Sequence, residues 1–233
     1  MKKLSDWNKV PAMQWPLLIF DLDGTLIDSA EDITSALNKT LEFYGKPPLP
    51  HEVVVAHIGE GLRKLLADFF PEHKNSPTET YRPIQERFLR TYEEEMYKTT
   101  RPFPGAVEFL QNYPGLKGVV TNKNEDPAKK IIRHLGLDTI PWVGVFGADT
   151  WSEKKPHPLP LQEMMKRAGH SATTTFMIGD GTPDMAAAQN AGVRAIAVEF
   201  GYSKIEILQK YAPVATFKDY AELHNLILEL INR

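Results

Sequence analysis

The sequence contains no cysteine, which excludes disulfide bonds, thiolate metal sites and a cysteine nucleophile. It also lacks any apolar run that approaches the ~20 residues of a membrane-spanning helix. The segment Met1–Pro16 lacks the continuous apolar stretch of a signal peptide, and its sequence indicates no function of its own. We therefore expect a cytoplasmic protein that does not bind a membrane, in keeping with a reducing compartment.

Neither sign of charge predominates in the chain. The 27 lysine and arginine residues and the 30 aspartate and glutamate residues give a formal net charge of -3 at pH 7. This balance gives no reason to expect nucleic acid as a partner. Internal repeats and low-complexity tracts are absent. A chain of 233 residues, 42% hydrophobic and 24% charged, is typical of one large domain or of a core with a smaller insertion.

What the sequence does contain is a short buried strand that ends on two carboxylates. Four apolar residues, Leu17–Phe20, predict the strand, and Asp21 and Asp23 follow it. On an extended backbone, residues two apart point to the same side, so the two carboxylates project together. Gly24 then allows the chain to turn away. Two like charges at the end of a buried strand are costly unless a cation or a shared proton compensates, which favours a metal site.

Two alternatives apply to the same segment. A solvated turn is one, because Asp and Gly are frequent in turns. A calcium-binding loop is the other, and it needs Gly at its sixth position and Glu at its twelfth. Counted from Asp21, those positions hold Leu26 and Asp32, so the calcium alternative fails.

Helical periodicity follows this segment. Apolar residues recur with helical spacing in three stretches, residues 33–44, 62–70 and 84–96. Ser29 and Asp32 are spaced like a capping box at the start of the first helix. The insertion of about seventy residues is far longer than the ~2–6 residues that ordinarily join a strand to a helix. It is therefore interpreted as a second domain.

Strands alternate with helices in the remainder of the chain. Further strands are predicted at residues 117–121, 142–146, 174–178 and 194–198. Such alternation implies a parallel sheet that is covered on both faces. We predict an α/β fold in which residues 1–28 and 101–233 form a Rossmann-like parallel-sheet core. Residues 29–100 are predicted to form an inserted helical cap domain.

Polar residues follow the carboxyl ends of the predicted strands, where open parallel sheets bind ligands. These residues are Asp21, Asp23, Thr121, Asn122, Lys155, Asp180 and Asp184. Each has an ordinary alternative: a strand-to-helix turn for the Thr–Asn pair, a solvated charge for the lysine, and helix capping for the last two aspartates. Independent accidents would not all fall at one edge of a sheet, so together they favour a functional site.

These strings resemble the four motifs of the haloacid dehalogenase-like phosphohydrolases, in order and in spacing. The matching strings are Asp21-Leu22-Asp23-Gly24-Thr25, Thr121-Asn122, Lys155-Pro156, and Gly179-Asp180 with Asp184. The helical insertion is similar to the cap of that superfamily. Within it, the nearest likeness is to the bacterial phosphoglycolate phosphatases, through Ile58-Gly59-Glu60-Gly61, Thr121-Asn122-Lys123 and Lys155-Pro156-His157-Pro158.

The resemblance implies a two-step phosphoryl transfer. Asp21 would be the nucleophile that forms an aspartyl-phosphate, and Asp23 would protonate the leaving group and then activate water. Lys155 would add positive charge beside the nucleophile and the phosphate. The residues expected to bind a metal offer hard oxygen atoms, and those expected to bind the phosphate offer a hydroxyl and an amide.

Magnesium is the cation that this ligand set implies. Mg²⁺ would be held by Asp21, the backbone carbonyl of Asp23, and Asp180. Asp184 would lie behind these ligands, holding a metal-bound water or the lysine. The Thr121 hydroxyl and the Asn122 amide would bind the phosphoryl oxygens.

In the insertion, Gly59 lies in a loop expected to cover the site, and Arg63 is a candidate for binding a substrate carboxylate. The alternative for Arg63 is a solvated surface charge. Read as a dinucleotide-binding fingerprint, Gly59-x-Gly61 lacks the third glycine, because Lys64 occupies its place.

We therefore expect a magnesium-dependent phosphatase for a small phosphorylated metabolite, with 2-phosphoglycolate as the first candidate. The enzymatic alternatives are a phosphosugar mutase or a sugar-phosphate phosphatase of the same superfamily. A dehalogenase is disfavoured because it does not need the acid at Asp23, and a phosphonate hydrolase because that group has a smaller residue at this position. The alternative of another class is a non-catalytic module that binds a phosphorylated ligand. A monomer or a homodimer is expected.

Overall fold

A computed structural model of the chain describes residues 15–73 and 78–231. Within them, six parallel strands form one sheet in the order β5-β4-β1-β6-β7-β8. The strands are β1 (Leu17–Phe20), β4 (Lys117–Val120), β5 (Trp142–Phe146), β6 (Thr175–Gly179), β7 (Arg194–Val198) and β8 (Ala215–Phe217). The predicted α/β fold with a parallel-sheet core is confirmed. Because β4 and β6 pair with β1 on either side, β1 lies inside the sheet. The loops that follow β1 and its neighbours leave the sheet in different directions, which opens a crevice at the carboxyl end of β1.

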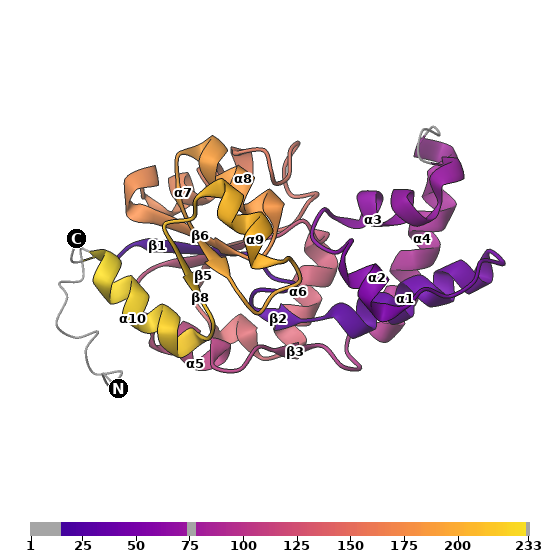
Figure 1. Cartoon of the computed structure of the whole chain (residues 1–233), viewed down its shortest axis with the longest axis horizontal. Helices are drawn as coiled ribbons and strands as arrows, with labels where there is room; N and C mark the ends of the chain where they lie inside the picture. The colour runs from indigo at the N-terminus through magenta and orange to yellow at the C-terminus, as the bar shows by residue number, and fades with distance from the viewer. Residues whose placement is uncertain (1–14, 74–77, 232–233) are drawn as a thin grey trace.

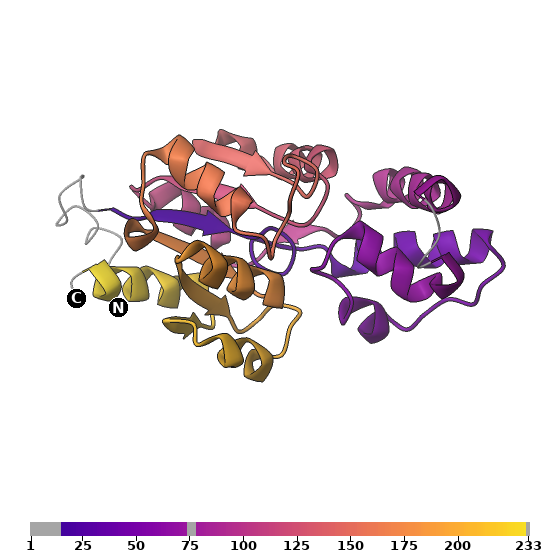
Figure 2. The same ribbon diagram turned by 90° about the horizontal axis from the view of Figure 1, so that it is seen from above.

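Helices cover both faces of the sheet, as Figures 1 and 2 show. Leu18 and Phe20 of β1 belong to the cluster that includes side chains of α5 (Ala106–Asn112), α6 (Glu125–His134) and α10 (Tyr220–Ile231). Leu17 and Ile19 face the opposite way, into the cluster formed with α7 (Leu159–Ala168), α8 (Thr182–Ala191) and α9 (Ile205–Leu208). The period-two alternation of strand side chains therefore divides the apolar core into two layers.

The remaining helices lie together beyond the carboxyl end of β1, at one end of the molecule (Figures 1 and 2). They are α1 (Ala30–Phe43), α2 (His51–Val55), α3 (Leu62–Phe69) and α4 (Thr78–Glu95). We call residues 29–100 the cap. The chain enters and leaves the cap through two short strands, β2 (Ile27–Asp28) and β3 (Arg101–Pro102), which pair antiparallel with each other.

The predicted capping box of α1 is wrong. Ser29 does occupy the N-cap position, but its hydroxyl makes no cap bond and donates instead to Asp23 Oδ1 at 2.5 Å. Asp32 accepts hydrogen bonds from the backbone N–H groups of Thr99 and Thr100, at the far end of the cap. In a cap the hydroxyl oxygen would accept from a backbone N–H of the helix, whereas here the hydroxyl donates to a buried carboxylate that the tertiary fold brings within reach.

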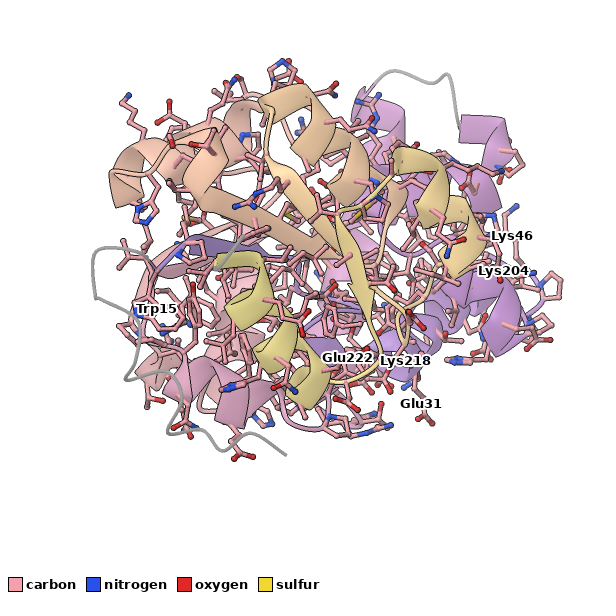
Figure 3. The ribbon with its side chains drawn as sticks, turned by 60° about the vertical axis from the view of Figure 1, so that its left-hand side comes forward. Trp15, Glu31, Lys46, Lys204, Lys218 and Glu222 are labelled. Carbon is pink, nitrogen blue, oxygen red and sulfur yellow. The ribbon has the colours of Figure 1, made fainter. Side chains whose placement is uncertain are left out.

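Several short elements carry too little sequence pattern to be predicted, namely α2, α5, α9, β8 and the β2–β3 pair. Most of Met1–Pro16 lies outside the described residues. Trp15, labelled in Figure 3, is 7% exposed and packs edge-on against Tyr113 with ring centroids 5.8 Å apart. Within residues 15–73 and 78–231, no helix has the length and apolar character needed to cross a membrane.

Candidate active site

The nucleophile candidate is fixed at the end of β1 by the neighbouring strand and by a buried lysine. The Asp21 backbone N–H donates to the carbonyl of Ile178 on β6 at 2.9 Å. Its carboxylate Oδ1 accepts from the Leu22 N–H at 2.7 Å and lies 2.9 Å from Lys155 Nζ. Asp21 is only 5% exposed, so its orientation is set by the fold rather than by solvent.

Lys155 connects two carboxylates from different elements: Asp21 follows β1, and Asp184 lies in the first turn of α8. Its side chain is 1% exposed, and Nζ lies 2.6 Å from Asp184 Oδ1 as well as 2.9 Å from Asp21. The other oxygen of Asp184 accepts from the Gly181 N–H at 2.9 Å, so this aspartate also caps α8. Lys155 is therefore not a solvated surface lysine. Asp184 does cap a helix, as its ordinary alternative proposed, but it also binds Lys155.

Asp180 is held by polar donors on both carboxylate oxygens. The Thr25 hydroxyl donates to Oδ1 at 2.9 Å, and the Tyr202 backbone N–H donates to Oδ2 at 2.8 Å. Glycines make the room for it, because a Cβ at Gly24 or Gly201 would overlap Asp180 itself. Gly24 also has φ +79°, a left-handed conformation that glycine adopts without strain.

Burial is the largest influence on the pKa values of Asp21 and Asp180. Burial, reinforced by the charge of Asp184, raises the pKa of Asp21 to about 7 although Lys155 opposes the shift. Burial and the charge of Asp21 raise the pKa of Asp180 well above its usual range. For Lys155, burial works against the charged form, but Asp184 and Asp21 outweigh it and raise the pKa of the ammonium. One lysine is therefore too little positive charge for three buried carboxylates.

These aspartates fit a hard divalent cation. One carboxylate oxygen each from Asp21, Asp180 and Asp184 lie within 4.8 Å of one another. Oxygen-only donors and an excess of buried negative charge are the properties that Mg²⁺ sites require. The structure thus brings together the predicted ligands Asp21 and Asp180 with Asp184, which was expected behind them.

Asp23 is paired with a second lysine that the sequence analysis did not assign. Lys123 Nζ lies 3.0 and 2.9 Å from the two carboxylate oxygens of Asp23, and its side chain is 8% exposed. The same ammonium lies 4.7 Å from the ring centroid of Tyr92 on α4. Burial is outweighed by the charge of Asp23, so the pKa of Lys123 is raised. Lys123 therefore links the acid–base candidate of the core to the cap.

A cleft with about 580 Å³ of open space lies between the core and the cap. Asp21, Asp23, Thr121, Asn122 and Lys123 line it on the core side. The cap contributes Ile33, His57, Ile58, Gly59, Gly61, Leu62, Leu65, Phe88, Leu89 and Tyr92. The cap side is therefore mostly apolar.

The two cap residues selected from sequence have different positions. Gly59 lines the cleft, and its carbonyl accepts from Asn122 Nδ2 at 3.0 Å. Nδ2 of Asn122 also donates to the Lys155 carbonyl at 3.0 Å, so this amide joins the cap loop to the lysine segment. Arg63 is exposed and is not among the residues that line the cleft. A contact between Arg63 and substrate stays a prediction.

Sequence reasoning missed four residues that hold the site: Thr25, Ser29, Lys123 and Tyr202. A signal existed for Lys123, which directly follows Thr121-Asn122 at a strand end. None existed for Tyr202, which lies in the loop after β7; its backbone N–H donates to Asp180 and its hydroxyl accepts from the Ser29 N–H.

The parallel-sheet fold and this cluster of aspartates around a lysine are typical of one class of hydrolase. Residues 18–198 match the family model of the haloacid dehalogenase-like hydrolases, so the chain belongs to that family and the predicted resemblance is confirmed.

Proteins similar to this chain include phosphoglycolate phosphatases from bacteria. The chain is 34% identical over 218 residues to a phosphoglycolate phosphatase of Agrobacterium fabrum, covering 92% of this chain and 93% of the relative. It is 36% identical over 215 residues to a phosphoglycolate phosphatase of Rhodospirillum rubrum, covering 88% of each. The crystal structure of a predicted phosphoglycolate phosphatase from Haemophilus somnus superposes with a TM-score of 0.81 at 26% identity, covering 91% of this chain and 98% of that one.

Proposed function

We propose that this protein is a magnesium-dependent phosphatase that hydrolyses a small phosphorylated metabolite through a phosphorylated Asp21. The observation that carries the proposal is the buried ammonium of Lys155, placed 2.9 Å from Asp21 Oδ1 and 2.6 Å from Asp184 Oδ1. A cation in this position favours the charged nucleophile and offsets the negative charge of an arriving phosphate.

The two aspartates of the first motif divide the reaction into two displacements. In the first, an Asp21 oxygen attacks phosphorus, the bond to the leaving alcohol breaks, and Asp23 donates a proton to the departing oxygen. In the second, Asp23 removes a proton from water, which attacks the phosphorylated Asp21 and releases inorganic phosphate. Ser29 and Lys123, both bonded to the Asp23 carboxylate, hold it beside the cleft.

Asp21, Asp180 and the backbone carbonyl of Asp23 would hold the metal, with Asp184 behind them. Magnesium would supply positive charge that offsets the phosphoryl oxygens. Thr121 is 3% exposed and lines the cleft, so its hydroxyl is the candidate donor to those oxygens. The Asn122 amide is a further candidate, provided that it leaves one of its two carbonyl acceptors. We also propose the cap and core boundaries given above, with the cap excluding water when it closes.

Among substrates, 2-phosphoglycolate is the first choice, because the relatives from A. fabrum and R. rubrum are phosphoglycolate phosphatases. A sugar-phosphate phosphatase or a mutase would use the same aspartates. Release of inorganic phosphate, rather than an isomerised sugar phosphate, separates hydrolysis from mutase activity. A cytoplasmic location and a monomeric or dimeric state stay predictions.

Phosphate release from a panel of phosphorylated metabolites, with magnesium present, tests the proposal. We expect Asp21→Asn to abolish turnover of every substrate while the variant stays folded. Asp126→Asn is the matched control, since its carboxylate is 75% exposed and pairs with surface Lys130 at 2.9 Å. Release of phosphate by Asp21→Asn at the wild-type rate would overturn the assignment of the nucleophile.

A further inference from the structure

We propose that Lys123 recognises a carboxylate on the leaving group, so that the core, rather than Arg63 of the cap, selects short phosphorylated hydroxy acids. This inference rests on the proposed phosphatase function and names the substrate class of the same site. The starting observation is a lysine inside the cleft whose ammonium contacts Asp23 and the Tyr92 ring at once.

The position of Lys123 matches the covalent structure of such a substrate. In a phosphorylated 2-hydroxy acid, one carbon separates the ester oxygen from the carboxylate carbon. Asp23 must come within hydrogen-bond distance of the ester oxygen to protonate it. A group that binds the carboxylate must then lie next to Asp23. Lys123 Nζ, 2.9 Å from Asp23 Oδ2, meets this requirement.

An ammonium has three N–H donors, and the substrate can take one of them without displacing Asp23. Two donors suffice for the Asp23 oxygens at 3.0 and 2.9 Å. The side of the ammonium toward Tyr92 faces an aromatic ring, 4.7 Å from its centroid. A cation–ring contact is weaker than a charged hydrogen bond to a carboxylate. The third N–H of Lys123 therefore binds the substrate carboxylate in preference to the Tyr92 ring.

The other basic groups near the cleft are directed elsewhere. Among the described residues that line it, His57 is the basic residue besides Lys123. Its Nδ1 lies 2.8 Å from the Val53 carbonyl, and its Nε2 lies 3.9 Å from Asp68. Lys154 donates to the Glu60 carbonyl, and Arg63 is exposed outside the cleft. Lys123 is thus the cation best placed for a substrate carboxylate.

The apolar side chains of the cap set an upper limit on the polarity of the leaving group. Ile33, Leu65 and Phe88 of the cap line the same cleft as Lys123. A sugar phosphate would place several hydroxyl groups against these side chains, and each hydroxyl left without a partner is costly. A two- or three-carbon hydroxy acid places its one polar group on Lys123. The cleft therefore discriminates against sugar phosphates.

Three substrates separate the possible roles of Lys123. Nitrophenyl phosphate has a good leaving group and no carboxylate, ethyl phosphate needs the acid but has no carboxylate, and 2-phosphoglycolate needs both. For Lys123→Met, we expect kcat/KM to fall least on nitrophenyl phosphate. On 2-phosphoglycolate it should fall about 10- to 100-fold further than on ethyl phosphate, the range expected for one charged hydrogen bond.

Two further variants complete the experiment. Lys129→Met is the control, because that lysine lies on α6, just after the loop that carries Lys123, is 50% exposed and pairs with Glu125; its kinetics should match wild type on all three substrates. Lys123→Gln replaces the Met variant if the latter does not fold, since its amide can still donate to Asp23, and the same order of losses is expected.

The outcomes are distinguishable. A larger loss on 2-phosphoglycolate than on ethyl phosphate supports carboxylate recognition. Equal losses on these two substrates would show that Lys123 only positions Asp23, and would overturn the proposal. If the wild-type protein with magnesium releases phosphate from no member of the metabolite panel, the proposed function fails; if it acts on other members but not on 2-phosphoglycolate, only this inference fails.

Discussion

Gly24 and Asp180 lie so close together that no side chain can be accommodated at position 24, where even a Cβ would overlap the carboxylate. The two residues come from the first and the fourth predicted motif. The adjoining hydrogen bond, from the Thr25 hydroxyl to Asp180, joins residues that are 155 positions apart. The turn after β1 and the loop after β6 are therefore fitted to each other, and the position of Asp180, the candidate metal ligand, depends on both.

Gly24→Ala should abolish magnesium-dependent activity, because the added methyl group displaces Asp180. Gly45→Ala is a matched control for backbone strain: Gly45 has φ +70° against +79° for Gly24, but nothing lies within 4 Å of its Cβ position. Both variants should lose about 1 kcal/mol of stability from the left-handed backbone. Phosphate release at a fixed magnesium concentration compares the activities of the two variants, and urea denaturation compares their stabilities. Equal activity of the two variants would contradict it.

Lys155→Met should reduce kcat at least about 100-fold, since the variant loses the charge beside Asp21. It should also destabilise the metal-free protein by about 3 kcal/mol, because breaking a buried ion pair leaves carboxylates without a partner. Lys154→Met, one position earlier, removes a partly exposed lysine bonded to the Glu60 carbonyl and should cost much less activity. Similar losses in the two variants would show that the segment, rather than the buried charge, matters.

Magnesium should be required for turnover and should stabilise the folded state. We expect excess chelator to stop phosphate release and excess calcium to inhibit it, because calcium's looser coordination misplaces the nucleophile. The melting temperature should rise with magnesium in the wild type but not in Asp180→Asn. A magnesium-dependent rise of equal size in both proteins would place the ion elsewhere.

The stability of the cap should depend on pH through Glu95, which is 4% exposed in its side chain. Hydrogen bonds from Lys39 and Lys98, both at 2.6 Å, lower the pKa of Glu95 from 4.5 to about 2. A pKa that is lower in the folded than in the unfolded state gives stability that is present above pH 4.5 and is lost as pH falls toward 2.

Glu95→Gln should therefore destabilise the protein at pH 7 by about 1–2 kcal/mol, a figure reduced because both lysines are largely exposed. The difference from wild type should shrink between pH 4.5 and 2. Urea denaturation at several pH values measures it. A difference that is constant over this range would show that the Glu95 charge is not involved.

Residues next to strand ends were predictable, because strand patterns and motif spacing together indicate which side chains meet at one edge. Asp21, which directly follows β1, is an example, and motif spacing added Lys155 in the loop after β5. Residues that reach the site from other elements were not predictable, and Tyr202 is one, since only the fold brings its backbone N–H to Asp180. The same reason explains Ser29: local spacing indicated a helix cap, and a tertiary acceptor changed its partner.

The pairing of β2 with β3 places the two ends of the cap side by side, with Ile27 opposite Pro102 and Asp28 opposite Arg101. An insertion whose ends are adjacent can be exchanged for another of different length without moving any strand of the sheet. Selection can thus vary the surface that meets the leaving group while the aspartates of β1 and β6 keep their places. A graft of this cap onto a related core, joined at the β2–β3 pair, would carry its apolar lining with it but leave Lys123 behind.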